Sequence, residues 1–194
     1  DIGSIELDLS NINSALSPFF HVPLEQLDLS GQNLSSVPLD NILEDSYIKS
    51  IDLSDCMIKS YKGLFYELEC LEKVKLTNLS AVNNNDLRRI FSRCKSLEEI
   101  DLSSMDFGTD VDMSEAFYHC TKLKSIKWPA NSKINVNNLE GTFYNCQLLE
   151  KIDLSVFEGS TVDKISYTFE KYALSIIAGI LDSDSPIANA SFAT

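Results

Sequence analysis

The chain has 194 residues, 44% of them hydrophobic and 23% charged, a composition that suits one domain with a substantial core. Its formal net charge of -13 argues against nucleic acid and anionic membrane surfaces as partners, because both attract clustered Lys and Arg. A basic or neutral protein, or a glycan, remains compatible with this charge. The longest apolar stretch, residues 172–181, is about half the length that spans a bilayer, so we expect no membrane insertion by this chain.

A seven-residue unit, LxxLxLS, recurs along the chain and is the main signal for its fold. Its copies begin at residues 4, 24, 48, 71, 97, 123 and 149, and spacings of this size are typical of leucine-rich repeats. In Leu27-Asp28-Leu29, alternate side chains of a short strand point to opposite faces, so the leucines enter a core and Asp28 faces outward. One repeat cannot bury its leucines alone, and we therefore predict stacked coils that share one core.

The return segments between later units carry an apolar residue, then Phe four positions on, then Cys three further on. Such spacing puts three side chains on one face of a short helix. The copies are Leu87/Phe91/Cys94, Met113/Phe117/Cys120 and Leu139/Phe143/Cys146, with Ile165/Phe169/Tyr172 replacing the cysteine. The predicted fold class is α/β: a leucine-rich-repeat solenoid of about seven repeats, with a parallel sheet on the concave side and short helices on the convex side.

The chain, residues 1–194, is predicted to be one domain with three parts. Residues 1–23 would form the first repeat or an N-terminal cap, and residues 24–172 the regular repeats. After Tyr172 the frame slips, and an apolar run at 174–181 ends in the breaker sequence 182–186. Residues 173–194 would then be a C-terminal cap over the last repeat or the start of a truncated one.

The phrase from Met113 to Ile126, MSEAFYHCTKLKSI, is followed by a second copy, GTFYNCQLLEKI, from Gly141 to Ile152. Their common pattern, F-x-x-C-x-x-L-x-x-I, resembles the BspA-like leucine-rich repeats and covers roughly residues 86–172. The resemblance implies a solenoid used for adhesion or host-protein binding, usually at a cell surface, and it brings no catalytic residues.

The sequence departs from the general leucine-rich-repeat pattern at the position where an asparagine usually follows the strand. The residues there are Ile12, Gln32, Cys56, Leu79, Met105, Asn131 and Phe157. A mostly apolar column cannot form the usual asparagine hydrogen bonds, so the backbone groups of these turns must be satisfied in another way.

The outward residues at the centres of the predicted strands form the candidate binding site on the concave face. They are Asp8, Asp28, Asp52, Lys75, Asp101, Lys127 and Asp153, with Ser30 and Ser54 flanking the acidic end. From Asp52 onward the charges alternate, which is mildly favourable across strands. Three acids without an intervening cation at the N-terminal end would suit a bound cation or a Lys or Arg of a partner. The alternative is that water and salt simply screen these exposed carboxylates.

No catalytic, metal or cofactor site is expected. The chain has two histidines, His21 and His119, and lacks the motifs of a P-loop, a serine hydrolase or a dinucleotide site. Zinc would need paired ligands close in sequence, and the cysteines fall in core positions where a thiolate is disfavoured. Trp128 occupies a leucine position and is expected to fill the core.

The sequence therefore favours a non-catalytic module that binds a protein, or possibly a glycan, on its concave face. The resemblance implies a bacterial adhesion or host-interaction protein at the cell surface or in secreted form. An intracellular scaffold, a secreted effector fragment and a structural spacer remain as alternatives.

Overall fold

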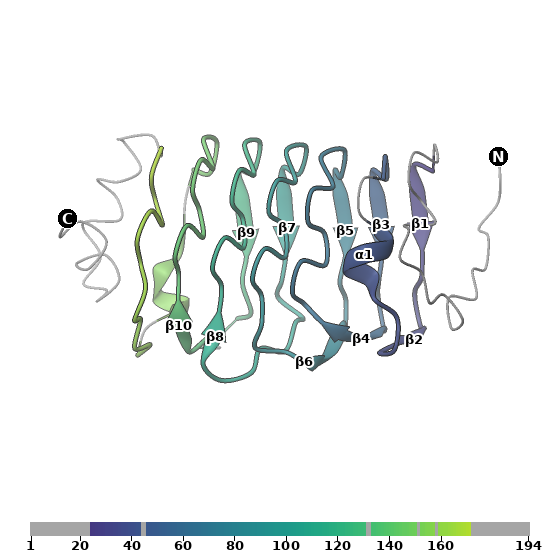
Figure 1. Ribbon diagram of the computed structural model, residues 1–194, viewed down its shortest axis with the longest axis horizontal. Coiled ribbons are helices and arrows are strands. Elements are labelled where there is room, and N and C mark those ends of the chain that lie inside the picture. The colour runs from purple at the N-terminus through teal and green to yellow at the C-terminus, as the bar shows by residue number, and fades with distance from the viewer. Residues whose placement is uncertain (1–23, 44–45, 131–132, 151, 158, 172–194) are drawn as a thin grey trace.

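The computed structural model describes residues 24–43, 46–130, 133–150, 152–157 and 159–171. Over these residues the chain forms a stack of coils that run side by side (Figure 1). One strand of each of the first five coils lies in a common row, and all paired neighbours in it are parallel. The row consists of β1 (Gln26–Asp28), β3 (Ser50–Asp52), β5 (Lys73–Lys75), β7 (Glu99–Asp101) and β9 (Ser125–Lys127).

A second row of short strands lies along another side of the stack. It consists of β2 (Asn33–Leu34), β4 (Met57–Ser60), β6 (Ser80–Asn83), β8 (Val111–Asp112) and β10 (Val136–Asn138). Both rows are interrupted, since the sheets are β1-β3-β5 and β7-β9 in the first row and β2-β4-β6 and β8-β10 in the second. In the first row the break between β5 and β7 coincides with the point where the repeat spacing lengthens from 23 to 26 residues.

The prediction of short convex helices is wrong. In the described residues the return segments are successive turns, apart from the five-residue helix α1 (Leu39–Leu43). Each later return segment has two residues with a left-handed backbone, four positions apart. These pairs are Gly63/Glu67, Arg89/Arg93, Glu115/His119, Gly141/Asn145 and Tyr167/Lys171. A positive φ at the third position of a four-residue turn is what a type II turn requires.

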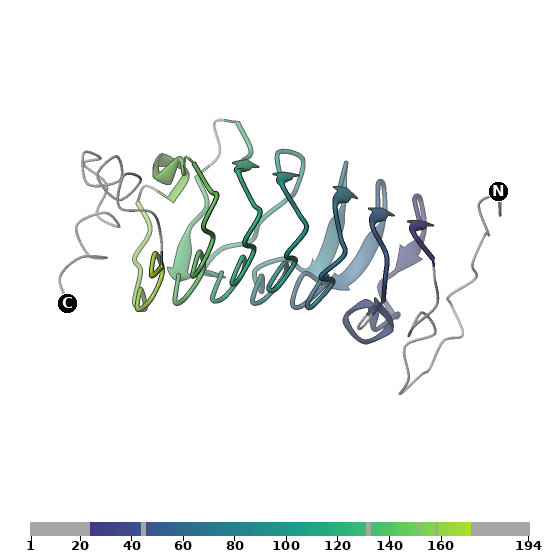
Figure 2. The same ribbon diagram turned by 90° about the horizontal axis from the view of Figure 1, so that it is seen from above.

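Hydrogen bonds between coils explain why turns replace helices. The N–H groups of Arg89, Phe91 and Arg93 donate to carbonyls of the next coil at 3.1, 2.9 and 2.7 Å. Such bonds need coils about 4.8 Å apart, whereas stacked helices would need about 10 Å. The return side is therefore no wider than the strand side, and the stack shows little curvature (Figure 2). The predicted concave face is accordingly nearly flat, and we call it the strand face and the opposite side the turn face.

The predicted count of seven repeats differs from the structure, in which five coils carry the first-row strand. The first sequence copy, residues 4–10, lies outside the described residues, as do the proposed caps at 1–23 and 173–194. The last copy forms no strand among the described residues, and the 3-10 helix η1 (Leu154–Phe157) follows its central position.

A column of phenylalanines runs through the core behind the turn face. Phe65, Phe91, Phe117, Phe143 and Phe169 stack in sequence with ring centroids 4.9 to 5.7 Å apart. The apolar and cysteine positions beside the phenylalanines are fully buried from Leu87 to Cys146, so their inward orientation is as predicted. Trp128 is half-buried and meets Phe117 and Phe157 edge-on, which agrees with its predicted place in the core.

In the turns that lack the usual asparagine, other side chains donate hydrogen bonds to the backbone carbonyls. The thiol of Cys56 donates to the carbonyl of Leu29 at 2.9 Å, and the hydroxyl of Ser104 donates to the carbonyl of Leu76 at 3.1 Å. Leu79 and Met105 are buried in the same column. These turns are thus held by apolar packing and by single side-chain donors.

Candidate functional site on the strand face

The strands place the predicted outward residues side by side. Asp28 pairs in register with Asp52, and Asp52 with Lys75, along β1, β3 and β5. Asp101 pairs with Lys127 across β7 and β9. The intervening Leu27 and Ile51 are buried, because alternate residues of a strand point to opposite faces. Asp8 lies outside the described residues, and Asp153 is the central position of the last copy, which forms no strand in the described part.

The serines that follow the aspartates have a local structural role. An oxygen of Asp28 accepts the backbone N–H of Ser30 at 3.0 Å, and Asp52 accepts that of Ser54 at the same distance. Asp101 and Asp153 form the same turn with Ser103 and Ser155, at 2.9 and 3.0 Å. The recurring Asp-Leu-Ser sequence is therefore an Asx-turn, and it ends β1, β3 and β7. This turn occupies one carboxylate oxygen and leaves the other, Oδ2, for a second contact.

At two positions a lysine forms an ion pair with that second oxygen. Lys75 Nζ lies 2.8 Å from Asp52 Oδ2, and Lys127 Nζ lies 2.7 Å from Asp101 Oδ2. Burial acts to raise the pKa of Asp52, but hydrogen bonds from Lys75 and Ser54 outweigh it and lower the pKa. For Asp101, the hydrogen bonds from Lys127 and then from Ser103 bring the pKa down to about 2. The alternating part of the row is therefore largely self-neutralised.

Asp28 differs from Asp52 and Asp101, the other aspartates in the first row of strands, because no cation lies within ion-pair distance of its Oδ2 among the described residues. Its neighbour in the next strand is Asp52, whose Oδ2 already contacts Lys75. The predicted strip of Asp8, Asp28 and Asp52 is thus reduced, within the described part, to the exposed carboxylate of Asp28 beside an ion pair. Asp153 also has no cation partner there, at the opposite end of the row.

A shallow hollow adjoins Asp28 at the start of the same three strands. It is lined by Glu25, Gln26, Lys49, Ser50, Glu72 and Lys73. Lys49 Nζ lies 2.6 Å from Glu25 Oε1, whereas Lys73 has no carboxylate within ion-pair distance among the described residues. The sequence analysis missed this second polar row, although the repeat spacing places its residues next to one another.

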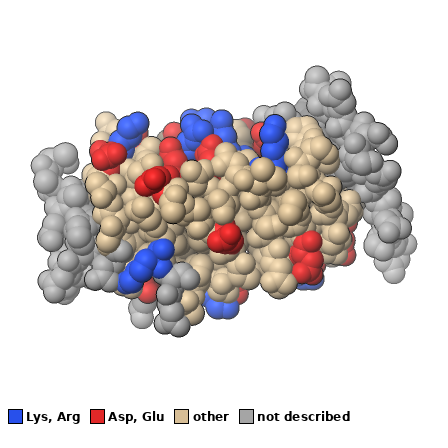
Figure 3. Space-filling model, turned by 90° about the horizontal axis from the view of Figure 1, so that it is seen from below, with Lys and Arg blue, Asp and Glu red and all other residues tan. Residues whose placement is uncertain are grey.

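The flank that carries β2, β4 and β6 is different in character. Charged side chains are sparse over much of this side of the molecule (Figure 3). Asparagines bridge neighbouring coils there, for example from Asn78 Nδ2 to Asp55 Oδ1 at 2.9 Å. The charge pattern that distinguishes the strand face is therefore not spread evenly around the stack.

The turn face holds an aromatic cluster that the sequence analysis did not identify. Tyr118 and Tyr144 stack with ring centroids 4.8 Å apart, and His119 lies against both rings. His119 Nδ1 is 3.1 Å from Asn145 Nδ2. Burial, followed by the nearby charges of Arg93, Lys171 and Lys95, lowers the pKa of His119. The 26-residue spacing between Tyr118 and Tyr144 was the available signal for this cluster.

The cysteine column lacks the features of a nucleophile or a metal site. The thiols of Cys94, Cys120 and Cys146 are fully buried and donate to carbonyls of the preceding coil at 3.0 to 3.1 Å. Burial raises the pKa of each of these thiols, that of Cys146 to about 12. Among the described residues, no group of three or more His, Cys, Asp or Glu side chains is arranged to hold a metal ion.

Comparison with known families agrees with this architecture. The profile of the BspA type leucine rich repeat region matches residues 4–107 and 87–193, with six copies. The chain belongs to this family. The resemblance noted from the Phe-Cys-Leu-Ile pattern is thereby confirmed, and BspA-type repeats indicate a protein-interaction module of a generally non-catalytic kind. Proteins with BspA-type repeats are generally extracellular or surface-associated in bacteria.

No curated protein and no solved structure is significantly similar to this BspA-type chain. In the part of the chain that the structure describes, no helix has the length and apolar character needed to cross a membrane.

Proposed function

We propose that this BspA-type chain is a protein-binding module that holds its partner on the N-terminal half of the strand face. It would act in adhesion or host interaction, at a bacterial cell surface or in secreted form. The observation that carries the proposal is Asp28, an exposed carboxylate whose Oδ2 has no cation partner within the described residues. A Lys or Arg side chain of the partner would complete there the pairing that Lys75 makes with Asp52.

The adjoining hollow also favours partner binding on the N-terminal half of the strand face. Lys73 and the Lys49–Glu25 pair lie beside the row that contains Asp28, so a partner could contact both charge signs within a few strands. Complementary charges of this kind fix the orientation of a partner and speed its association. In the C-terminal half, Lys127 neutralises Asp101, and the exposed Glu99 and Asp153, which have no cation partner among the described residues, lie away from this hollow.

The proposal is tested with the biotinylated chain on an array of secreted and cell-surface proteins. We expect at least one saturable partner, whose affinity falls about tenfold or more in Asp28→Lys, because a hydrogen bond to a charged group contributes about 1.5–3 kcal/mol. Glu140→Lys makes the same charge change at an exposed position of the turn side and should bind as the unchanged chain does.

Two results would overturn the proposal. One is a partner whose affinity is equal for the unchanged chain and for Asp28→Lys, when thermal melting shows that the variant is folded. The other is the absence of any saturable protein partner on the array, which would favour a glycan ligand or a spacer role.

A further inference from the structure

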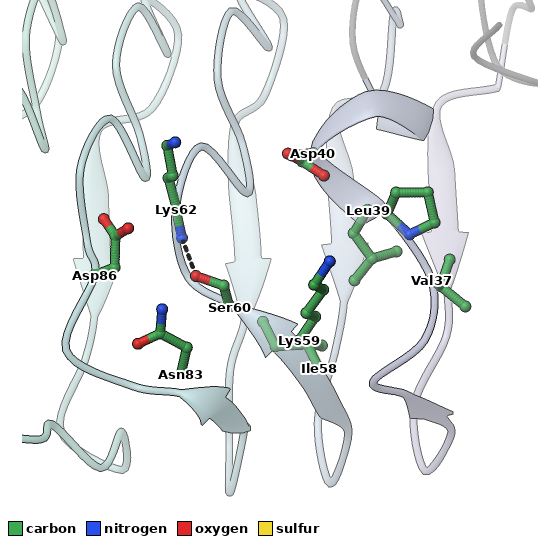
Figure 4. A pocket seen from close by; sticks show the side chains of 10 residues that line it. Val37, Leu39, Asp40, Ile58, Lys59, Ser60, Lys62, Asn83 and Asp86 are labelled. Atoms are coloured by element: carbon green, nitrogen blue, oxygen red, sulfur yellow. Dashed lines mark hydrogen bonds between the residues drawn. The ribbon is translucent and has the colours of Figure 1, made fainter. Parts of the chain in front are cut away.

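The helix α1 interrupts the otherwise regular stacking of the turn face. The return segments at 63–67, 89–93, 115–119 and 141–145 each donate three backbone hydrogen bonds to the next coil, such as those from Gly63, Phe65 and Glu67 at 2.9 Å each. No backbone hydrogen bond joins Leu39–Leu43 to residues 63–67 in the described structure. A helix is about 10 Å across and cannot align with a turn segment at the spacing of stacked coils. A hollow, here called the α1 hollow, lies between α1 and the following two coils (Figure 4).

The cations of the α1 hollow are unusual for this acidic chain. Lys59 and Lys62 both line the hollow, and neither has a carboxylate within 4.0 Å among the described residues. Asp86 also lines the hollow, but Arg88 holds both of its oxygens at 2.8 and 2.7 Å. Asp40, at the start of α1, is then the one lining carboxylate without such a partner in the described structure. The hollow is thus lined by two lysines without an ion pair and by one such carboxylate.

The remaining lining adds hydrogen-bond donors and apolar residues. Ser60 Oγ accepts the backbone N–H of Lys62 at 3.1 Å, which leaves its hydroxyl hydrogen free to donate. The exposed amide of Asn83 makes no side-chain hydrogen bond among the described residues, and Figure 4 shows it beside Ser60 and Asp86. Ile58, next to Lys59, and Val37, on the α1 side of the hollow, are buried apolar residues of the lining.

We propose that the α1 hollow binds an Asp or Glu side chain from an acidic segment of a partner protein. The ammonium groups of Lys59 and Lys62 pair with the carboxylate, and Asn83 and Ser60 donate further hydrogen bonds to it. The methylene groups of the side chain lie against Ile58. This site is separate from the strand face, and it does not depend on Asp28.

The test uses fluorescein-labelled hexaglutamate as the probe, with hexaglutamine as the uncharged control, in fluorescence anisotropy at low ionic strength. We expect saturable binding of hexaglutamate alone, weakened at least tenfold in Lys59→Gln/Lys62→Gln. The matched control is Lys122→Gln/Lys164→Gln, which removes two exposed lysines elsewhere and has the same net charge. Amide NMR shifts on adding the probe should be largest near Ser60 and Asn83.

Equal weakening in the two double variants would overturn the proposal, because it would mean attraction to lysines in general. Absence of hexaglutamate binding to the unchanged chain would do so as well. A hexagalacturonate probe that binds more than tenfold tighter than hexaglutamate would assign the hollow to an acidic sugar instead. Thermal melting of each variant excludes loss of the fold as the cause.

Discussion

The rings of Phe91 and Phe117 stack in neighbouring coils with their centroids 5.7 Å apart and their planes 8° apart. Their backbones follow the same alignment, because the N–H of Phe91 donates to the carbonyl of Ala116 at 2.9 Å. Side-chain stacking and inter-coil hydrogen bonding therefore share one repeat distance. The 26-residue period is the sequence feature that keeps both in register.

Removing one ring of the phenylalanine column should destabilise the folded chain. We expect Phe117→Ala to lower the free energy of unfolding by about 3–5 kcal/mol, since it leaves a cavity between two stacked rings. Phe117→Leu, which fills much of the space, should cost on the order of 1 kcal/mol. Urea denaturation followed by circular dichroism measures both. Val82→Ala, at a position that is 71% exposed, is the control and should change stability by less than about 0.5 kcal/mol. A Phe117→Ala chain as stable as this control would contradict the structural role of the column.

The left-handed turns predict a cost for adding a side chain at Gly141. Its φ is +62°, and a Cβ there would meet Glu115 and Tyr118 only at ordinary contact distances of 3.5 and 3.7 Å. Backbone strain is then the main effect, and Gly141→Ala should destabilise the chain by about 1 kcal/mol. Thermal or urea unfolding measures the change, with Glu140→Ala as the neighbouring control. If Gly141→Ala were neutral or stabilising, the left-handed geometry of this turn would be wrong.

The burial pattern of the repeats could be predicted from sequence, whereas their backbone conformation could not. Spacings of four and three bury Phe91 and Cys94 equally well on a helix or on two successive turns. The choice between these depends on hydrogen bonds to the next coil, which one repeat does not reveal. Left-handed residues give little signal either, because Arg89 and Arg93 occupy positions that hold Gly63 and Glu67 one coil earlier.

The candidate site, too, could be predicted only in part from the sequence. Alternating charges on neighbouring strands predicted the contacts of Lys75 and Lys127 with their aspartates, because the register follows from the repeat. The Asx-turn of Asp28 with Ser30 is local, and the repeated Asp-Leu-Ser sequence could have revealed it. The α1 hollow depends on a mismatch between a helix and the turns of the following coils, and no single segment encodes that mismatch.

The pair of Lys127 and Asp101 should be visible in the titration of the carboxylate. Lys127→Gln removes the largest cause of the lowered pKa, so we expect the pKa of Asp101 to rise from about 2 toward the ordinary value of about 3.9. It should stay somewhat low, because Ser103 still donates to Asp101. Since the pair is exposed, unfolding free energy should change by less than about 1 kcal/mol.

Carboxyl carbon NMR shifts followed against pH measure the pKa of Asp101 directly. Lys124→Gln is the control, because it removes the neighbouring pair with Glu98 and leaves Lys127 in place. A pKa of Asp101 that moves equally in the two variants would rule out a specific contribution of Lys127.

His119 should make stability depend on pH. Gln147 Nε2 donates to Asn145 Oδ1 at 2.8 Å, which orients the Asn145 amide so that its Nδ2 donates to His119 Nδ1. Burial disfavours the charged ring most, followed by the nearby cations, and Nδ1 can accept this hydrogen bond only when it carries no proton. The folded pKa therefore lies below the unfolded value of about 6.5. The contribution of His119 is fully present above about pH 6.5 and is lost as the pH falls through the lower folded pKa.

His119→Gln removes this titration while keeping a side chain of similar reach at the position. We expect the unfolding free energy of the unchanged chain to decline between about pH 7 and pH 5 more steeply than that of the variant. Any effect of His21 is common to both proteins and cancels in the difference. Urea titrations at closely spaced pH values give the two slopes. Equal slopes would mean that His119 titrates alike in the folded and unfolded chain, and the hydrogen bond from Asn145 would then have no preference for the neutral ring.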